Sequence, residues 1–98
     1  LDQQTKGQIT MYINVFDTHV HTRDGRYLHF DVFTNSNNLA QARNYAQQFL
    51  KQNNIEEDNI SQSSCAFCHS ESSSPEVEQA IGQTGYYIFK MQGCQGMS

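Results

Sequence analysis

The sequence predicts an α+β domain built on a mixed four-stranded sheet with two helices, in the order β-β-α-β-α-β. Two early segments alternate apolar and polar residues on either side of an Asp-Gly turn, as hairpin strands do. Two later segments carry apolar residues at helical spacing. The closing segment is apolar on both faces, which is typical of a central strand. The four strands are predicted at residues 11–22, 27–34, 59–66 and 86–91. We expect both helices to cover the same face of the sheet.

The loop of the first hairpin decides which side chains share a face of the sheet. A two-residue loop would pair Thr22 with Tyr27 and would mix apolar and polar groups on both faces. A three-residue loop, with Gly25 in the left-handed conformation, would pair Thr22 with Arg26. Because the second register separates polar from apolar side chains, we predict that register.

In the predicted register, one face of the hairpin is apolar and the other is polar. The apolar face consists of Phe16, Val20, Leu28, Phe30 and Val32. The polar face holds a cluster of ionisable residues, Asp17, His19, His21, His29 and Asp31. Three apolar residues fall at one end of this polar face, namely Ile13, Val15 and Phe33. That end must therefore be covered by another part of the chain.

Both helices have recognisable ends. The first is predicted between a capping cluster at residues 35–38 and the neighbourhood of Asn53. Its apolar stripe consists of Leu39, Ala42, Ala46, Phe49 and Leu50. The second begins with Ser74 and Pro75, a cap followed by a first-turn proline, and it stops at Gly85.

Reactive side chains are densest in the turn Cys-Ala-Phe-Cys-His at residues 65–69. Cys65 and Cys68 have the spacing of half a zinc site, since two thiolates on a tight turn can bind one ion. A structural site needs two further ligands, for which His69, Cys94 or a hairpin histidine are candidates. The predicted metal ligands are Cys65, Cys68, His69 and Cys94, with zinc as the ion. The alternative is a turn with two ordinary thiols, one of them buried.

Two other chemistries fit this turn less well. The pattern is also that of c-type haem attachment, which needs export, a second axial ligand and a large apolar pocket. No export signal is visible in the sequence, and 98 residues leave little room for haem. A redox dithiol needs a thiolate at the start of a helix, but the predicted helix begins only at Pro75.

The polar face of the hairpin is a second candidate site. In the predicted register Asp17 lies opposite Asp31, and two facing carboxylates repel unless a cation or a protonated histidine is near. The three histidines on this face suit metal binding or acid–base chemistry. The alternative is a solvated face on which both carboxylates bond to the backbone or to Thr18.

Composition narrows the classes of function. The chain has 98 residues and a formal net charge of −4, which indicates one domain and argues against a nucleic-acid surface. It contains no apolar run long enough to cross a membrane. An odd number of cysteines indicates a reducing compartment, so we expect a cytoplasmic protein. The domain is predicted at residues 11–94, between a polar extension (1–10) and a short tail (95–98).

Several pieces of the chain, in order, are similar to those of one family. They lie at residues 15–18, 24–25, 29–33, 65–70, 75–77 and 85–94, and the most specific are Cys-Ala-Phe-Cys-His and the closing Lys-Met-Gln-Gly-Cys. The chain thus resembles DUF2024, a small, mostly bacterial family described as a domain of unknown function. The resemblance implies a small α+β fold and no known activity. His19 and His21 depart from the family's usual pattern, so the resemblance does not extend to a site built on them.

From these observations we expect a small non-catalytic domain. It would bind a protein partner, a small ligand or a metal ion through the turn that contains Cys65, Cys68 and His69. The alternative is a small metal- or thiol-dependent enzyme that uses this turn together with the hairpin histidines. Neither nucleic acid nor a membrane is an expected partner.

Overall fold

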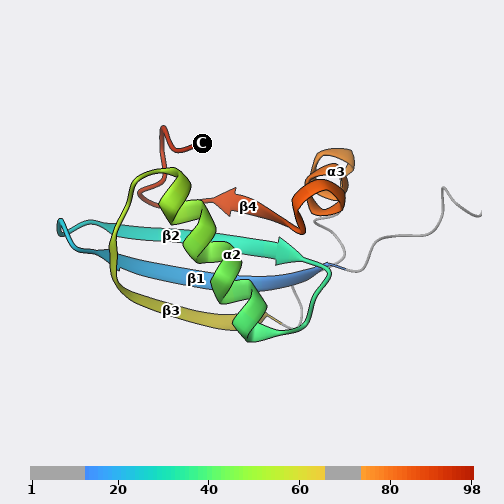
Figure 1. The fold of residues 1–98 in the computed structure, drawn as a ribbon, viewed down its shortest axis with the longest axis horizontal. Helices are drawn as coiled ribbons and strands as arrows, with labels where there is room; N and C mark the ends of the chain where they lie inside the picture. Colours follow the sequence, from blue (N-terminus) through green and yellow to red (C-terminus); the bar gives the residue numbers. More distant parts are fainter. Residues whose placement is uncertain (1–12, 66–73) are drawn as a thin grey trace, which may run out of the picture.

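The fold was analysed in a computed structural model, which describes residues 13–65 and 74–98 (Figure 1). Within these residues the chain forms four strands and two helices in the predicted order, which confirms the α+β class. The strands are β1 (Asn14–Thr22), β2 (Tyr27–Thr34), β3 (Glu57–Cys65) and β4 (Tyr86–Lys90). The helices are α2 (Leu39–Gln52) and α3 (Pro75–Thr84). Neither of these helices is long and apolar enough to cross a membrane.

The four strands form one sheet in the order β3-β1-β2-β4. Every neighbouring pair is antiparallel, so the expectation of a mixed sheet is wrong. The prediction that the last strand is central is also wrong, because β4 lies at an edge beside β2 (Figure 1). This edge strand is apolar on both faces because Tyr86 packs into one core and Tyr87 packs against another on the opposite face.

The hairpin has the predicted register. The backbone N–H of Thr22 donates to the carbonyl oxygen of Arg26 at 2.9 Å, and Asp17 lies opposite Asp31. Gly25 has a φ of +88°, a conformation that glycine adopts at little cost. The three-residue loop is therefore confirmed, and with it the division of the hairpin into an apolar and a polar face.

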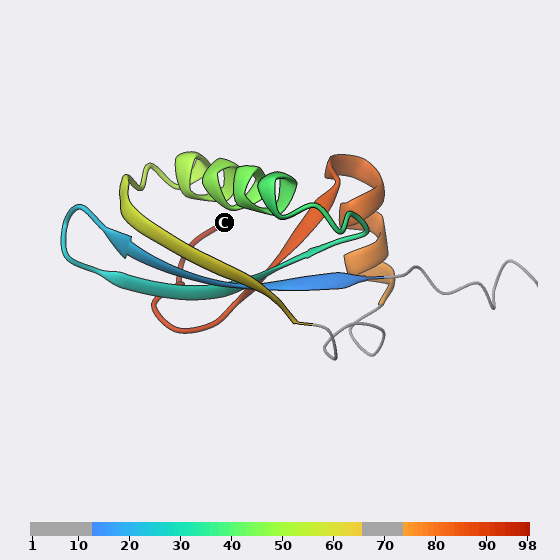
Figure 2. The same cartoon turned by 90° about the horizontal axis from the view of Figure 1, so that it is seen from below.

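Helix α2 runs along the apolar face of the sheet (Figure 2). It begins after Asn38, whose side chain accepts a hydrogen bond from the backbone N–H of Gln41. Phe49 is 2% exposed, and its ring meets that of Phe30 edge-on at 5.0 Å between centroids. The predicted stripe is confirmed except at its start, because Leu39 is 50% exposed.

Helix α3 stands at one end of the sheet (Figure 2), and its apolar residues pack against side chains of the polar face. It begins after Ser74, whose hydroxyl accepts a hydrogen bond from the N–H of Val77, and it ends at Gly85 as predicted. Val77 and Ile81 form a second core with Ile13, Val15 and Phe33. The expectation that both helices share one face is therefore wrong, because α3 covers the apolar end of the polar face.

Candidate metal site on the polar face of the sheet

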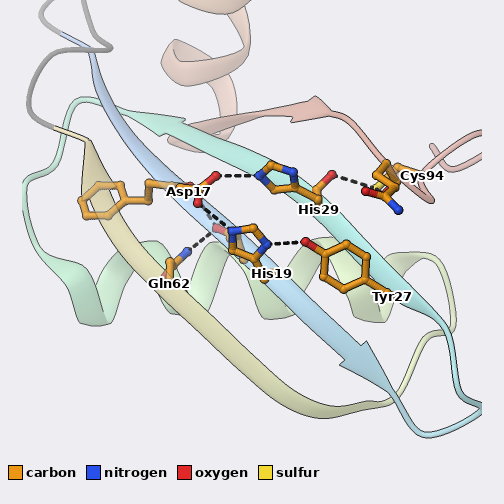
Figure 3. A network of polar contacts seen from close by, with 9 residues as sticks. Asp17, His19, Tyr27, His29, Gln62 and Cys94 are labelled. Carbon is orange, nitrogen blue, oxygen red and sulfur yellow. Dashed lines mark hydrogen bonds and ion pairs between the residues drawn. The ribbon is translucent and has the colours of Figure 1, made fainter.

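Away from the end that α3 covers, the polar face of the sheet carries ionisable side chains that lie close together. Asp17 and His19 are two positions apart on β1, so the alternation of a strand points them to the same side. The register of the hairpin places His29 of β2 directly opposite His19. Figure 3 shows the Asp17 carboxyl group beside the two imidazole rings, with one of its oxygens toward each ring. Two paired strands are thus sufficient to assemble this group.

The three side chains meet at short distances. The Nε2 atom of His19 lies 2.7 Å from one carboxylate oxygen of Asp17, and Nε2 of His29 lies 2.6 Å from the other. The two imidazole rings stack with centroids 4.2 Å apart and planes 13° apart. The atoms that the three residues offer as ligands all lie within 4.8 Å of one another. Imidazole nitrogen and carboxylate oxygen are both ligands that Zn²⁺ accepts in proteins.

Asp17 is held in its charged form. Burial alone would raise its pKa, but hydrogen bonds and charge from His29 and His19 outweigh burial and hold the pKa of Asp17 below its ordinary value. An ionised carboxylate can only accept hydrogen bonds, so each histidine donates through its Nε2–H group. Thr18 does not take part, because its hydroxyl donates to the carbonyl oxygen of Phe16.

Asp31 lies beside this group in unfavourable surroundings. Burial, the negative charge of Asp17 and a hydrogen bond with Asp17 raise the pKa of Asp31 to about 6. Its Oδ1 atom is buried and has no hydrogen-bond partner among the described residues. A cation bound at Asp17 would add positive charge beside the two facing carboxyl groups and reduce their repulsion.

Tyr27 belongs to the same group, and the sequence analysis missed it. Its hydroxyl lies 2.5 Å from Nδ1 of His19, on the side of the ring away from Asp17 (Figure 3). The two rings lie side by side, with their centroids 5.9 Å apart and their planes inclined by 22°. The signal that could have found it is the alternation of β2, which puts Tyr27 on the same face as His29.

His21 does not join the convergent group. It is exposed, and its ring contacts Tyr27 at a tilt with 5.4 Å between centroids. Its nitrogens are not among the ligand atoms that lie together. Of the predicted cluster, the structure brings together Asp17, His19 and His29, places Asp31 next to them and leaves His21 at the rim.

The predicted cysteine turn is largely outside the described residues. Cys68 and His69 both fall there, and Cys65 is the last residue of β3, where its backbone pairs with Val15. This position is at the end of the sheet that α3 covers. A zinc site at the turn therefore stays a prediction.

Cys94 lies elsewhere, in the core on the α2 side of the sheet. Its thiol donates to the backbone carbonyl oxygen of His29 at 3.6 Å (Figure 3). The same stretch of chain extends the pairing of β2. The backbone carbonyl oxygen of His29 accepts from the N–H of Met91, and the backbone N–H of His29 donates to the carbonyl oxygen of Gln92. Burial raises the pKa of the Cys94 thiol, which disfavours the thiolate that a metal ion needs. In this structure Cys94 acts as a support for β2 behind the polar cluster.

The polar cluster of Asp17, His19 and His29 lies outside the cleft that runs along β4. That cleft has a volume of about 520 Å³ and follows β4 between α2 and α3. Its lining includes Phe49, Glu76 and Ile88 but none of Asp17, His19 and His29. The clustered ligand atoms, and not the cleft, therefore define the candidate site.

Comparison with known proteins identifies relatives but no activity. Residues 11–91 match the family model described as "Domain of unknown function (DUF2024)". The chain is similar to the NMR structure of protein NE1680 from Nitrosomonas europaea, with 40% sequence identity and a TM-score of 0.73. That match covers 86% of this chain and 99% of the other. No curated protein matches the chain.

Proposed function

The chain belongs to the DUF2024 family, and we propose that this member binds a divalent transition-metal ion through Asp17, His19 and His29. Zn²⁺ is the ion that these ligands suit, since it takes imidazole nitrogen and carboxylate oxygen in tetrahedral sites. The observation that supports the proposal is the convergence of three ligand atoms within 4.8 Å on one face of the sheet.

The present geometry needs only a small adjustment to hold the ion. The nitrogen–oxygen distances of 2.6 and 2.7 Å are those of hydrogen bonds. Around a tetrahedral zinc ion with bonds of about 2.05 Å, neighbouring ligand atoms lie roughly 3.3 Å apart. Each of these two contacts would open by about 0.6–0.7 Å, which rotations of the side chains can supply.

The site is also open to solvent. The side chains of Asp17, His19 and His29 retain 37%, 35% and 24% of their exposure, so an ion can enter directly. Three protein ligands leave the fourth position of a tetrahedral ion for water or an external ligand. A bound cation would also offset the repulsion between Asp17 and Asp31.

Isothermal titration calorimetry with zinc chloride, on protein without a histidine tag, tests the proposal. We expect about one ion per chain and a loss of affinity of at least about tenfold in His19→Gln, His29→Gln or Asp17→Asn, because each removes a ligand. His21→Gln is the matched control, since His21 is on the same strand and face but outside the group. Wild-type affinity in all three ligand variants would overturn the proposal.

The cysteine turn is a second candidate for zinc, and the spacing of Cys65, Cys68 and His69 is what supports it. Calorimetry separates the two candidates. Cys65→Ser with Cys68→Ser should leave binding at the polar face intact, whereas a site at the turn would be lost in that variant and kept in His19→Gln. A second binding event in the wild type that disappears in the double serine variant would establish the turn as a separate site.

A further inference from the structure

The proposed metal site has a neighbour whose chemistry suits both its metal-free and its metal-bound state. We infer that Tyr27 is the positioning residue of the site: its hydroxyl orients the His19 ring and changes from hydrogen-bond donor to acceptor when a metal ion takes the place of the Nε2 proton. This inference rests on the proposed function, because it concerns how one of its ligands is held.

In the metal-free state the proton positions follow from Asp17. Its ionised carboxylate accepts from Nε2 of His19 at 2.7 Å, so the proton of a neutral His19 ring is on Nε2. The other ring nitrogen, Nδ1, is then a bare acceptor. The hydroxyl of Tyr27, 2.5 Å from Nδ1, therefore donates its hydrogen to His19.

A metal ion reverses these roles. The lone pair of Nε2 becomes the ligand, so the Nε2 proton is released to solvent and a proton is taken up at Nδ1, which leaves the ring neutral. Nδ1–H then needs an acceptor, and the oxygen of Tyr27 is already in place. The hydroxyl keeps its own proton and only rotates about its C–O bond. Histidines that bind metals characteristically donate their second N–H group to such a partner.

Few side chains could occupy this position in both states. A hydroxyl both donates and accepts, whereas a carboxylate only accepts and an ammonium only donates. The position is also fixed by packing, because the ring of Tyr27 lies beside that of His19 and contacts the ring of His21 at a tilt. Its half-buried place on β2 directly across from His21 keeps the hydroxyl beside Nδ1.

The test is Tyr27→Phe, which keeps the ring and removes the hydroxyl. We expect a zinc affinity about 10- to 100-fold lower than that of the wild type, the usual effect of removing such a partner. Tyr87→Phe is the matched control, because Tyr87 is a half-buried tyrosine on the same face that packs against the α3 core instead of the site. Its zinc affinity should equal that of the wild type.

Long-range ¹H–¹⁵N spectra of the imidazole rings add a readout that a merely structural role would not move. In the wild type, the protonated nitrogen of His19 should change from Nε2 to Nδ1 on addition of zinc. A metal-free His19 protonated on Nδ1, or wild-type affinity in Tyr27→Phe, would overturn the inference. If His19→Gln still loses zinc in that case, the metal site stands without the role of Tyr27. If His19→Gln also binds normally, both proposals fail.

Discussion

Asp31 lies in surroundings that disfavour the charged form of its carboxyl group. Burial and the neighbouring Asp17 raise its pKa from the ordinary 3.8 to about 6, so the folded protein prefers Asp31 protonated. Below about pH 4 the group is protonated in both the folded and the unfolded chain, and its contribution to stability is fully present. As the pH rises through about 6 the folded protein must ionise this carboxyl, and that contribution is lost.

We therefore predict that Asp31→Asn stabilises the metal-free protein at about pH 7.5. The amide has the same shape, carries no charge and can donate a hydrogen bond to Asp17. The gain in the free energy of unfolding should be roughly 1–2 kcal/mol, after allowance for the part of the side chain that solvent screens. At about pH 4 the gain should nearly vanish. Urea unfolding curves at both pH values measure the difference.

Asp58→Asn supplies the control for this prediction. Asp58 is an exposed carboxylate on β3, so its replacement should change the free energy of unfolding by less than about 0.5 kcal/mol at either pH. A gain from Asp31→Asn that is as large at about pH 4 as at about pH 7.5 would show that the Asp31 charge is not the cause.

Much of the candidate site could be predicted at this scale. Strand alternation and the register of the hairpin were enough to predict that Asp17, His19 and His29 share a face of the sheet. The rotamers could not be predicted, because they depend on packing among side chains. The sequence therefore could not show that His21 points to the rim while Tyr27 contacts His19.

Among the elements, the β1–β2 hairpin has the greatest influence on the site. Its loop sets the register, and a slip of one residue would put His29 on the face opposite to Asp17 and His19. The loop depends on Gly25, which has φ +88° and no other atom within 4 Å of where a Cβ would be. A side chain at this position would therefore meet backbone strain but no collision.

We predict that Gly25→Val lowers the free energy of unfolding by about 1–2 kcal/mol, the cost of a left-handed conformation for a residue with a Cβ. Gly25→Asn should cost less, since asparagine tolerates this region. Thermal and urea unfolding measure both. Gly82→Val is the control, because Gly82 lies in α3 with equally open space and no positive φ. A loss in Gly25→Val no larger than in Gly82→Val would contradict the role of the turn.

The sequence predicted which segments form helices and strands. It did not predict which of these elements lie next to one another. Capping residues and periodicity located α2 and α3, because these signals are local. The position of β4 and the face that α3 covers depend on contacts between distant segments. An apolar pattern on β4 shows that both its faces are covered, but the same pattern results from a second strand or from a helix.

At the scale of the whole molecule, the residues that the structure describes form two cores, one on each face of the sheet. The larger core lies between α2 and the sheet. The smaller core joins α3 to the start of β1 and the end of β2. Because both cores share these two strands, neither should unfold without disturbing the other. We therefore expect one cooperative transition.

Phe49→Ala tests this arrangement. Phe49 is 2% exposed and lies between α2 and the sheet, so its truncation should cost about 3–5 kcal/mol. The transition should remain single when it is followed by far-UV circular dichroism and by tyrosine fluorescence. Phe89→Ala is the control, since Phe89 is 46% exposed and should cost less than about 1 kcal/mol. A cost below about 1 kcal/mol for Phe49→Ala would mean that α2 contributes little to the core.

The hydrogen bonds of His29 with Met91, Gln92 and Cys94 also determine when, during synthesis of the chain, β2 gains its support. Cys94 is 65 residues beyond His29, so a ribosome releases the hairpin long before the segment that supports β2. Until residues 86–94 emerge, the outer edge of β2 has no strand to pair with. A growing chain would thus display all three proposed metal ligands early, yet could hold them rigidly only after the segment that pairs with the outer edge of β2 has emerged.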